Sequence, residues 1–392
     1  MRILHTSDWH LGSRLGSYDR SDELFKQVEY ICQIASQHAD VLLVAGDVFV
    51  RKSPELTKRL ARILAPYVHQ GLHIILVPGN HDDREHFRMM KALLTLKRSE
   101  SDRVHIVETR EFFCINDVQF AVIPYPTREL LEPYCSEETG TTRRNVSLSS
   151  AYADLIRSVT DKIVESQKPT VFVAHITVAG VTTPSEKEIS YNEDLRIGRE
   201  DLPKADNLAY IALGHIHQQQ QIEYPIPCWY SGNIERLDMG ERKDTKGVLL
   251  VDVPEYGPAT VTTWEQKESL KLDATSFYDI QISSTEIETL TEQYPDIDRA
   301  VVRIQVECEP TDDAIVIRRH ITEICQRCID VVLIGEGGFS AATAGVPATP
   351  RDYLTTVIDY LGDRYANDAD LPELKSRASQ LLREMENEIT ED

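Results

Sequence analysis

The sequence predicts an α/β fold with a mixed β-sheet, followed by a small α+β domain. Within residues 1–265, short β-branched runs alternate with amphipathic stretches and end in a series of strand-like runs, a pattern typical of α/β proteins. A length of 392 residues is enough for two or more domains with a sizeable core. A composition of 41% hydrophobic and 27% charged residues is that of a globular protein rather than a disordered one.

The first half of this block is expected to alternate strand and helix. Short β-branched runs predict strands at RILHTS (2–7), VLLVA (41–45) and LHIILV (72–77). Amphipathic periodicity predicts helices over 21–38, 54–68 and about 84–98. Pro54 suits the first turn of the second helix, where its missing N–H is tolerated.

The second half of the block is expected to be richer in strands. Shorter strands near 104–107, 111–115 and 118–123 lead to a polar loop, SEETGTTRRNVS (136–147), and to a helix over about 150–166. PTVFVAH (169–175) and LAYIALGH (208–215) are predicted to be buried strands. The pieces around 222–230, 247–253 and 259–264 are predicted to be antiparallel.

A domain boundary is expected near residues 266–275. Beyond it, a small α+β domain is predicted from YDIQIS (278–283), a polar helix, RAVVRIQV (299–306), a helix around 312–327 and DVVLIG (330–335). The stretch 335–350 has the composition of a flexible connector, and two helices are expected near 350–362 and 371–389. The expected domains are therefore 1–268, 275–365 and a terminal amphipathic helix at 368–392.

Charge and cysteine content restrict the classes of partner and compartment. A net charge of −22 argues against a nucleic acid held by a basic surface, so a polyanion would have to be attracted by bound cations. The seven cysteines are scattered in apolar segments, which favours buried thiols in a reducing compartment. Cys325 and Cys328 form a CxxC in a predicted helix and are expected to be buried thiols. Because no leader-like or membrane-spanning run is present, we expect a soluble cytoplasmic protein.

The five most apolar strands share a feature, because each ends at its carboxyl side in a potential metal ligand. These residues are Asp8 and His10, then Asp47, then Asn80 and His81, then His175, and finally His215 and His217. Ligand sites of α/β sheets form outside the carboxyl ends of strands, so these side chains are expected to converge. Strand parity places His215 and His217, two residues apart at the end of LAYIALGHIH, on one face, where each is expected to bind a separate ion. His5 has the opposite strand parity to Asp8 and His10 and is expected to face away.

Two carboxylates, four histidines and an asparagine are too many ligands for one tetrahedral zinc ion. They suit two octahedral or near-octahedral divalent metals with oxygen and nitrogen ligands, such as manganese or iron. Two metals about 3.5–4 Å apart can activate water and neutralise phosphoryl oxygens during displacement at phosphorus. The pattern therefore predicts a two-metal phosphoesterase site.

The motifs DWH, GD, GNHD and GHIH resemble the signature of the calcineurin-like metallophosphoesterase superfamily. More closely, HTSDWHLG, AGDVF, VPGNHD, GHIH and YSGNIERLDMGE resemble the SbcD family, bacterial nuclease subunits that pair with an SMC-like ATPase. The resemblance implies a β-sandwich flanked by helices, a small α+β capping domain and C-terminal helices. Protein phosphatases of the superfamily are disfavoured, because they carry Asp-Arg-Gly and a Glu after GNH where this chain has GDVFVRK and GNHDD.

The resemblance also implies a role for each site residue. Asp8, His10 and His217 would bind one metal, whereas Asn80, His175 and His215 would bind the other, with Asp47 bridging. His81 would lie beside the scissile phosphate and stabilise the transition state or protonate the leaving oxygen. In one respect the chain departs from archaeal and eukaryotic relatives, which carry a histidine where this sequence has Val50.

The activity implied is manganese-dependent exonuclease and endonuclease cleavage of DNA ends and hairpins in an SbcCD-type repair complex. The implied partners are DNA and an SbcC-like ATPase, with a homodimer inside a heterotetramer. An apolar stripe in the last helix either packs on its own domain or fills a groove of the ATPase; its residues are Leu371, Leu374, Ala378, Leu381 and Met385. Two alternatives stay open: a small-molecule phosphodiesterase or phosphatase with the same site, and a scaffold whose metals only stabilise the fold.

Overall fold

The computed structural model describes residues 1–16, 18–94, 103–134, 144–181, 196–334 and 377. The described chain divides into a unit Met1–Val332, treated below, and a unit Leu333–Asp392. The expected connector and the two C-terminal helices, including the apolar stripe, lie outside the described residues except for Arg377.

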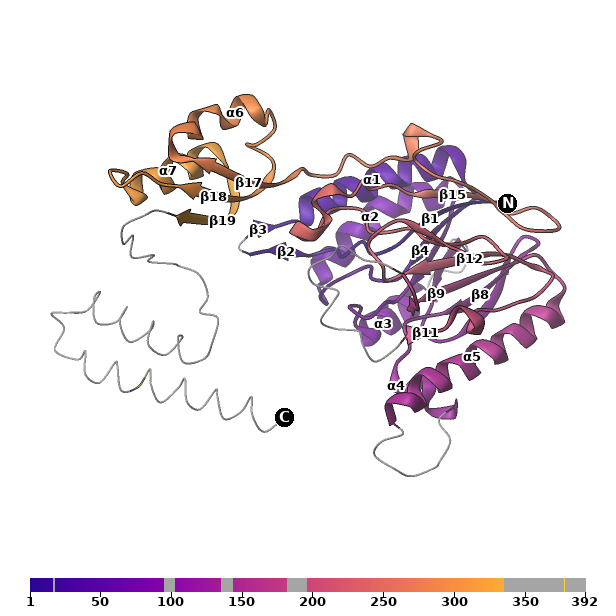
Figure 1. The fold of residues 1–392 in the computed structure, drawn as a ribbon. Helices are drawn as coiled ribbons and strands as arrows, with labels where there is room; N and C mark the ends of the chain where they lie inside the picture. The colour runs from indigo at the N-terminus through magenta and orange to yellow at the C-terminus, as the bar shows by residue number, and fades with distance from the viewer. Residues whose placement is uncertain (17, 95–102, 135–143, 182–195, 335–376, 378–392) are drawn as a thin grey trace. The chain divides into compact units, whose positions relative to one another are not determined.

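Two six-stranded mixed sheets form the body of the first unit. The first sheet has the order β16-β15-β1-β4-β5-β6, with bounds Thr260–Thr262, Leu249–Asp252, Arg2–Thr6, Val41–Ala45, His73–Val77 and Val104–Ile106. The second has the order β13-β14-β12-β9-β8-β7, with bounds Gln220–Ile222, Cys228–Tyr230, Leu208–Gly214, Thr170–His175, Val118–Ile123 and Glu111–Ile115. Figure 1 labels β1, β4 and β15 of the first sheet and β8, β9 and β12 of the second. Within each sheet four neighbouring strands are parallel. Antiparallel pairings lie at one edge of the first sheet and at both edges of the second.

Helices cover the outer face of each sheet, which gives four layers (Figure 1). The helices α1 (Ser21–His38), α2 (Pro54–His69) and α3 (Arg84–Leu94) pack on the first sheet through one apolar cluster. The helix α5 (Arg144–Ser166), with the short α4 (Arg128–Leu131), packs on the second sheet through another. A third cluster joins the inner faces of the two sheets and includes Ile3, Leu43, Val122, Val173 and Ala212.

This layering explains why the central strands are apolar on both faces. Every residue of β4, β8, β9 and β12 is buried, because one face meets the other sheet and the opposite face meets helices. At about 25 cal/mol per Å² of buried apolar surface, such double burial is the main stabilisation of the sandwich. The predicted α/β fold is confirmed.

Several predicted elements differ in detail from the structure. The helix expected from about residue 150 begins at Arg144, so the last part of the predicted polar loop is helical. The pieces around 222–230 form the expected antiparallel pair, β13 with β14, and β14 also pairs parallel with β12 on its other side. The predicted strand LAYIALGH ends one residue early, at Gly214.

A separate three-stranded sheet follows, in the order β17-β18-β19, with bounds Phe277–Ser283, Val301–Glu307 and Arg327–Ile334. The short α6 (Leu290–Gln293) and α7 (Ala314–Ile324) accompany it. The helix expected to reach residue 327 ends at Ile324, so Cys325 closes α7 and Cys328 lies on β19. The α+β character predicted for this segment is present.

The remaining regular elements are short: β2 (Arg14–Leu15), β3 (Tyr18–Asp19), β10 (Thr177–Val178) and β11 (Arg196–Ile197), with 3₁₀ turns such as Met239–Lys243. Among the residues described, no helix has the length and apolarity needed to cross a bilayer.

Candidate metal centre

The polar residues that follow the apolar strands of both sheets converge at one edge of the sandwich. Three overlapping groups of side chains have potential ligand atoms within 4.8 Å of one another. The groups are Asp8 with His10 and His217, then His10 with Asp47 and His81, and then Asp47 with His175 and His215. Asn80 joins the last group, since its Oδ1 lies 3.1 Å from His175 Nε2 and 3.0 Å from His215 Nδ1.

Most of these side chains leave loops rather than strands. The strand β1 ends at Thr6 and β12 ends at Gly214. Asp8, His10, Asp47 and His215 all have positive φ, between 46° and 98°. Such a backbone is uncommon outside glycine, and it clusters at functional sites. The idea that His215 and His217 share a strand face is therefore wrong, because the chain turns at His215 and brings each ring to the site separately.

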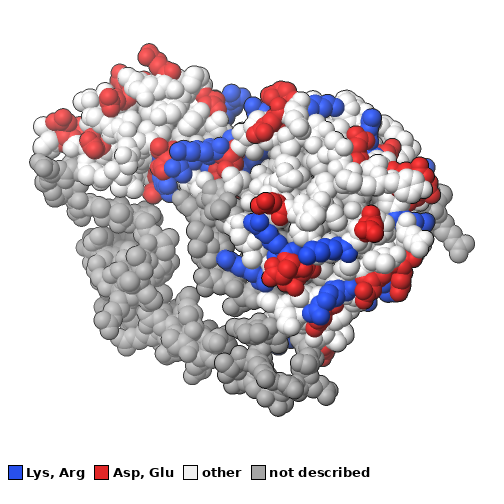
Figure 2. All heavy atoms as spheres, turned by 45° about the vertical axis from the view of Figure 1, so that its right-hand side comes forward, with Lys and Arg blue, Asp and Glu red and all other residues white. Residues whose placement is uncertain are grey.

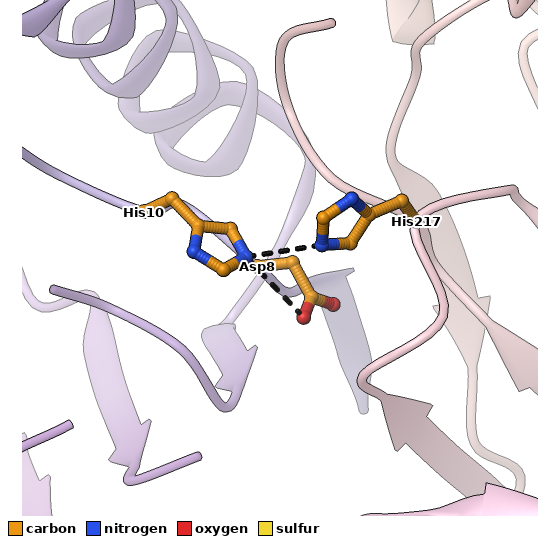
Figure 3. Close-up of side chains that lie close together, drawn as sticks. All are labelled: Asp8, His10 and His217. Carbon is orange, nitrogen blue, oxygen red and sulfur yellow. Dashed lines mark hydrogen bonds and ion pairs between the residues drawn. The ribbon is translucent and has the colours of Figure 1, made fainter. Parts of the chain in front are cut away.

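The rings of His10 and His217 meet edge-on at one side of the centre, with an interplanar angle of 72° (Figure 3). We call the group of Asp8, His10 and His217 the His217 position. The two Nε2 atoms are 3.1 Å apart, and His10 Nε2 lies 4.0 Å from Asp8 Oδ1. Asp8 and His10 are almost fully buried, whereas His217 is partly exposed. Three potential ligands from two different sheets thus meet at one point.

The other side, the His175 position, contains Asp47, Asn80, His175 and His215. Asp47 Oδ2 lies 3.4 Å from His175 Nε2 and 3.7 Å from His10 Nε2, so this carboxylate lies between the two positions. A Cβ on Gly46 would overlap the His175 ring. Gly46 also has a φ of +105°, which favours glycine. The chain after β4 is therefore packed tightly against the His175 ring.

The hydrogen bonds behind two histidines indicate where their lone pairs point. His175 Nδ1 donates to the Ala45 carbonyl at 2.8 Å, and His217 Nδ1 donates to Glu241 Oε1 at 2.8 Å. Each Nε2 of a neutral ring therefore carries a lone pair. These atoms face the oxygen of Asn80 or the nitrogen of His10. Lone pairs that converge in this way fit bound cations, and backing of a histidine by an acceptor is typical of metal ligands.

The pKa values of the cluster depend on burial and on mutual charge. Burial raises the pKa of Asp8 and lowers that of His10 well below its usual value. Burial alone would raise the pKa of Asp47 and lower that of His175. Their attraction outweighs burial, so the pKa of Asp47 falls and that of His175 rises to about 9. In the metal-free protein, a proton on His175 thus supplies the positive charge that a metal ion would provide.

His81 occupies a different place from the other histidines. Its side chain is exposed and its ring centroid lies 5.1 Å from that of His10. Its backbone N–H donates to Asp47 Oδ1 at 2.9 Å. The ring is therefore positioned at the mouth of the centre, open to a substrate. His5, expected to face away, is buried against Tyr210 at 2.8 Å and belongs to none of the three groups.

Asp82 is a buried site residue that the sequence motifs alone did not single out. Its carboxylate accepts from the N–H groups of Val48, Phe49 and Gly79 at 2.8–3.0 Å and so ties the Asp47 loop to the Asn80 loop. Burial, then the nearby Asp47, raises the pKa of Asp82 to about 7. The only signal in the sequence is its place in GNHD, directly after His81.

A second group that the sequence motifs did not single out lies behind His217 and is built by the segment YSGNIERLDMGE (230–241) together with Lys246. We call it the Glu241 cluster, formed by Asn233, Leu237, Glu241 and Lys246. Glu241 Oε2 accepts from Lys246 Nζ at 2.8 Å and from Asn233 Nδ2 at 2.9 Å. Burial favours the neutral acid, but Lys246 and His217 outweigh it and lower the pKa of Glu241. The same segment supports Asp8, because Ser231 donates to Ser7, whose hydroxyl donates to Asp8.

Two other sequence features are not part of the centre. Cys325 is buried and Cys328 half-buried; burial raises the pKa of these thiols to about 12 and about 11, and both are free cysteines. The prediction that both cysteines lie in one helix is wrong, because α7 ends at Ile324 and Cys328 lies on β19. Val50, at the place of the missing histidine, is half-buried and donates its N–H to Leu11.

The chain is similar to known phosphoesterases and nuclease subunits. A family model described as calcineurin-like phosphoesterase matches residues 1–219. Three relatives are each named as the SbcD component of the nuclease SbcCD. The protein of Rhodobacter capsulatus is 30% identical over 64% of this chain and 66% of its own length. That of Escherichia coli is 29% identical over 64% of each chain, and that of Bacillus subtilis is 26% identical over 68% of this chain and 69% of its own.

The similarity to SbcD proteins expected from the motifs is confirmed. The chain spans 66% of the length of the first of these relatives, just under two thirds. The matched segment contains every residue of the three ligand groups. Together, the family match and the clustered donors indicate a centre for divalent metal ions.

Proposed function

Because the chain belongs to the calcineurin-like phosphoesterase family, a family of metal-dependent phosphoesterases, we propose that it is a two-metal DNA nuclease. It would act as exonuclease and endonuclease on DNA ends and hairpins, within an SbcCD-type complex in DNA repair, recombination and replication. The observation that carries this proposal is the convergence of the ligand groups at one edge of the sandwich, in a chain similar to named nuclease subunits.

In this proposal each position binds one ion. Asp8, His10 and His217 would hold the first, and Asn80, His175 and His215 the second, with Asp47 shared. Manganese suits this mixture of carboxylate, amide and imidazole donors. When bound, two such ions polarise the phosphodiester and activate water. The protein itself orients the imidazoles through Ala45 and Glu241 and keeps the carboxylates dry.

His81 is the proposed catalytic residue. Its exposed ring stands beside His10, and its backbone is tied to Asp47. An imidazole in this place can donate a hydrogen bond to the phosphate or give a proton to the leaving oxygen. The other histidines of the centre face inward to one another, so they are less suited to this task.

Because the molecule is strongly acidic, its binding of DNA would depend on bound metal ions. In Figure 2, lysine and arginine side chains are interspersed with aspartate and glutamate across the face shown. Against a net charge of −22, phosphate must be attracted locally. Two divalent ions held by these residues would outweigh the two carboxylates of Asp8 and Asp47 and would make the centre positive.

The remaining proposals concern assembly. We propose a nuclease domain at 1–268, a capping domain at 275–365 and a terminal helix at 368–392 that binds an SbcC-like ATPase. The chain would form a homodimer inside a heterotetramer and act in the cytoplasm, as its scattered cysteines suggest. A small-molecule phosphodiesterase is not favoured, because the relatives are named as nuclease subunits.

A cleavage assay tests the proposal. The purified chain, alone and with its ATPase partner and ATP, is incubated with linear and hairpin DNA with and without Mn²⁺. We expect manganese-dependent cleavage that is about 10²- to 10⁴-fold slower in His81→Ala, with Mn²⁺ binding unchanged. His38→Ala, at the far end of α1, is the matched control and should cleave like the wild type.

Three outcomes would count against parts of the proposal. DNA left intact under all of these conditions would exclude a nuclease. Rapid turnover of a nucleotide or aryl phosphate without DNA cleavage would instead support the small-molecule alternative. Unchanged cleavage by His81→Ala would remove His81 from the catalytic role while leaving the metal centre in place.

A further inference from the structure

Glu241 is a fully buried carboxylate that touches neither the space between the histidines nor the solvent. It lies directly behind His217, at the end of the YSGNIERLDMGE segment. Its Oε1 atom accepts the hydrogen bond of His217 Nδ1 at 2.8 Å. Its contact with the centre therefore passes through one imidazole ring.

Three donors hold the other oxygen of this carboxylate. Oε2 accepts from Lys246 Nζ at 2.8 Å, from Asn233 Nδ2 at 2.9 Å and from the Leu237 N–H at 3.3 Å. Asp238 caps the same 3₁₀ turn by accepting from the N–H groups of Gly240 and Glu241. The carboxylate is thus fixed in one orientation, with Oε1 directed at His217.

An ionised carboxylate only accepts hydrogen bonds, so His217 Nδ1 must carry its proton. The lone pair of a neutral His217 ring is then on Nε2, which faces His10 Nε2 at 3.1 Å. The negative charge of Glu241 also makes the imidazole a stronger donor to a cation. Both effects act on the His217 position.

The His175 position is supported in another way. His175 Nδ1 donates to the Ala45 carbonyl at 2.8 Å, a neutral backbone group. A neutral acceptor would also suffice to fix the tautomer of His217. A buried charge pair such as Glu241 with Lys246 is costly to desolvate and gives little stability by itself. Its presence behind His217 is explained if a cation binds on the other side of the ring.

We propose that Glu241 is a positioning residue that sets the occupancy of the metal position formed by Asp8, His10 and His217. It would act through His217 alone, without touching metal or substrate. This inference rests on the proposed two-metal centre. It predicts that the two ions respond differently to a single substitution at a residue that touches neither of them.

Manganese binding by the full-length chain tests the inference. Glu241→Gln keeps the shape and an acceptor oxygen but removes the charge. Titration followed by calorimetry and by the electron paramagnetic resonance signal of free Mn²⁺ should show two ions in the wild type. In Glu241→Gln we expect one ion with unchanged affinity and the other bound about 10- to 100-fold more weakly. The activity lost at low Mn²⁺ should return at high Mn²⁺, with kcat close to that of the wild type.

Glu235→Gln is the matched control. Glu235 lies in the same segment, is 1% exposed, and accepts from the Thr275 N–H at 2.8 Å and the Thr275 hydroxyl at 3.1 Å. It contacts none of the proposed ligands, so both ions should bind as in the wild type. If Glu241→Gln does not fold because the buried Lys246 keeps only Asp244, at 3.3 Å, as a counterion, the double variant Glu241→Gln with Lys246→Met takes its place in the same titration.

The possible failures are distinguishable. A folded Glu241 variant that binds both ions with wild-type affinity overturns the inference and leaves the proposed function intact. Equal loss of both ions in the Glu241 and Glu235 variants also overturns it, because the segment would then be a general structural support. A wild-type chain that binds no Mn²⁺ contradicts the proposed centre itself.

Discussion

The two proposed metal positions are similar in their donor atoms but differ in the groups that hold their histidines from behind. At the His175 position, the histidine is backed by the carbonyl of Ala45, and a Cβ on Gly46 would overlap its ring. At the His217 position, the histidine is backed by a buried charge pair of Glu241 and Lys246. Backbone support can be changed only by altering the path of the chain, whereas side-chain support can be removed by one substitution. The halves of the centre should therefore respond to different mutations.

Asp47→Ala should have the largest effect, because Asp47 lies between both positions. Its Oδ2 atom is 3.4 Å from His175 Nε2 and 3.7 Å from His10 Nε2. We expect DNA cleavage to fall by about 10³-fold or more, since metal ions contribute several kcal/mol to such reactions. Calorimetry should show weaker binding of both ions. Loss of only one ion would show that the carboxylate is not shared.

Lys246→Met should disrupt only the support of the His217 position, which is the buried pair of Glu241 and Lys246. It leaves the buried Glu241 carboxylate without its cation, a change that costs about 3–5 kcal/mol. The free energy of unfolding in urea measures this loss. Glu241→Gln added to Lys246→Met should recover part of it, because the remaining charge is then removed. A double variant that is less stable than Lys246→Met would contradict the pairing.

Gly46→Ala is the corresponding change at the His175 position. The added Cβ would overlap the His175 ring at a φ of +105°, and a strained backbone of this kind costs about 1–3 kcal/mol. We expect one Mn²⁺ ion to bind more weakly, and it should be the ion that Glu241→Gln leaves unaffected. A double variant with Gly46→Ala and Glu241→Gln should bind both Mn²⁺ ions more weakly. If both single variants weaken the same ion, the division into two positions is wrong.

The smallest expected effect is a pH dependence of stability and metal binding at the His175 position. Burial acts to lower the pKa of His175, but the Asp47 charge raises it to about 9 in the metal-free protein. The metal-free chain should therefore lose stability as the pH rises from about 6.5 towards 9, because the folded state alone retains this proton there. An ion at the His175 position must displace the proton, so its binding near pH 8 should release about one proton. Calorimetry in buffers of different ionisation enthalpy measures this release, and no release would contradict the shifted pKa of His175.

Much of the centre could be predicted because metal ligands follow apolar strands. The strand ends before Asp8, Asp47, Asn80 and His175 were recognisable from β-branched runs, and parallel strands bring their carboxyl ends to one edge. Strand parity failed as a guide to His215 and His217, because the chain leaves the strand at Gly214 and takes a φ of 98° at His215. A positive φ outside glycine has no signal in a single sequence.

The groups that support the ligands were harder to anticipate. Glu241 lies 24 positions after His217 and its role depends on a hydrogen bond between the two side chains. Asp82 is one residue from His81 but points into the Asp47 loop instead of the centre. A buried carboxylate cannot be recognised from spacing alone, since acidic residues are usually exposed.

The sequence by itself determined the fold class, the approximate position of the apolar strands and the set of candidate donor side chains, because hydrophobic periodicity and residue type are local properties. Only the tertiary structure decided which lone pairs converge and which charges lie behind them. Those contacts join residues as far apart as Asp8 and His217, and they depend on loop conformations set by the packing of two sheets. The difference between the His175 and His217 positions is of this second kind.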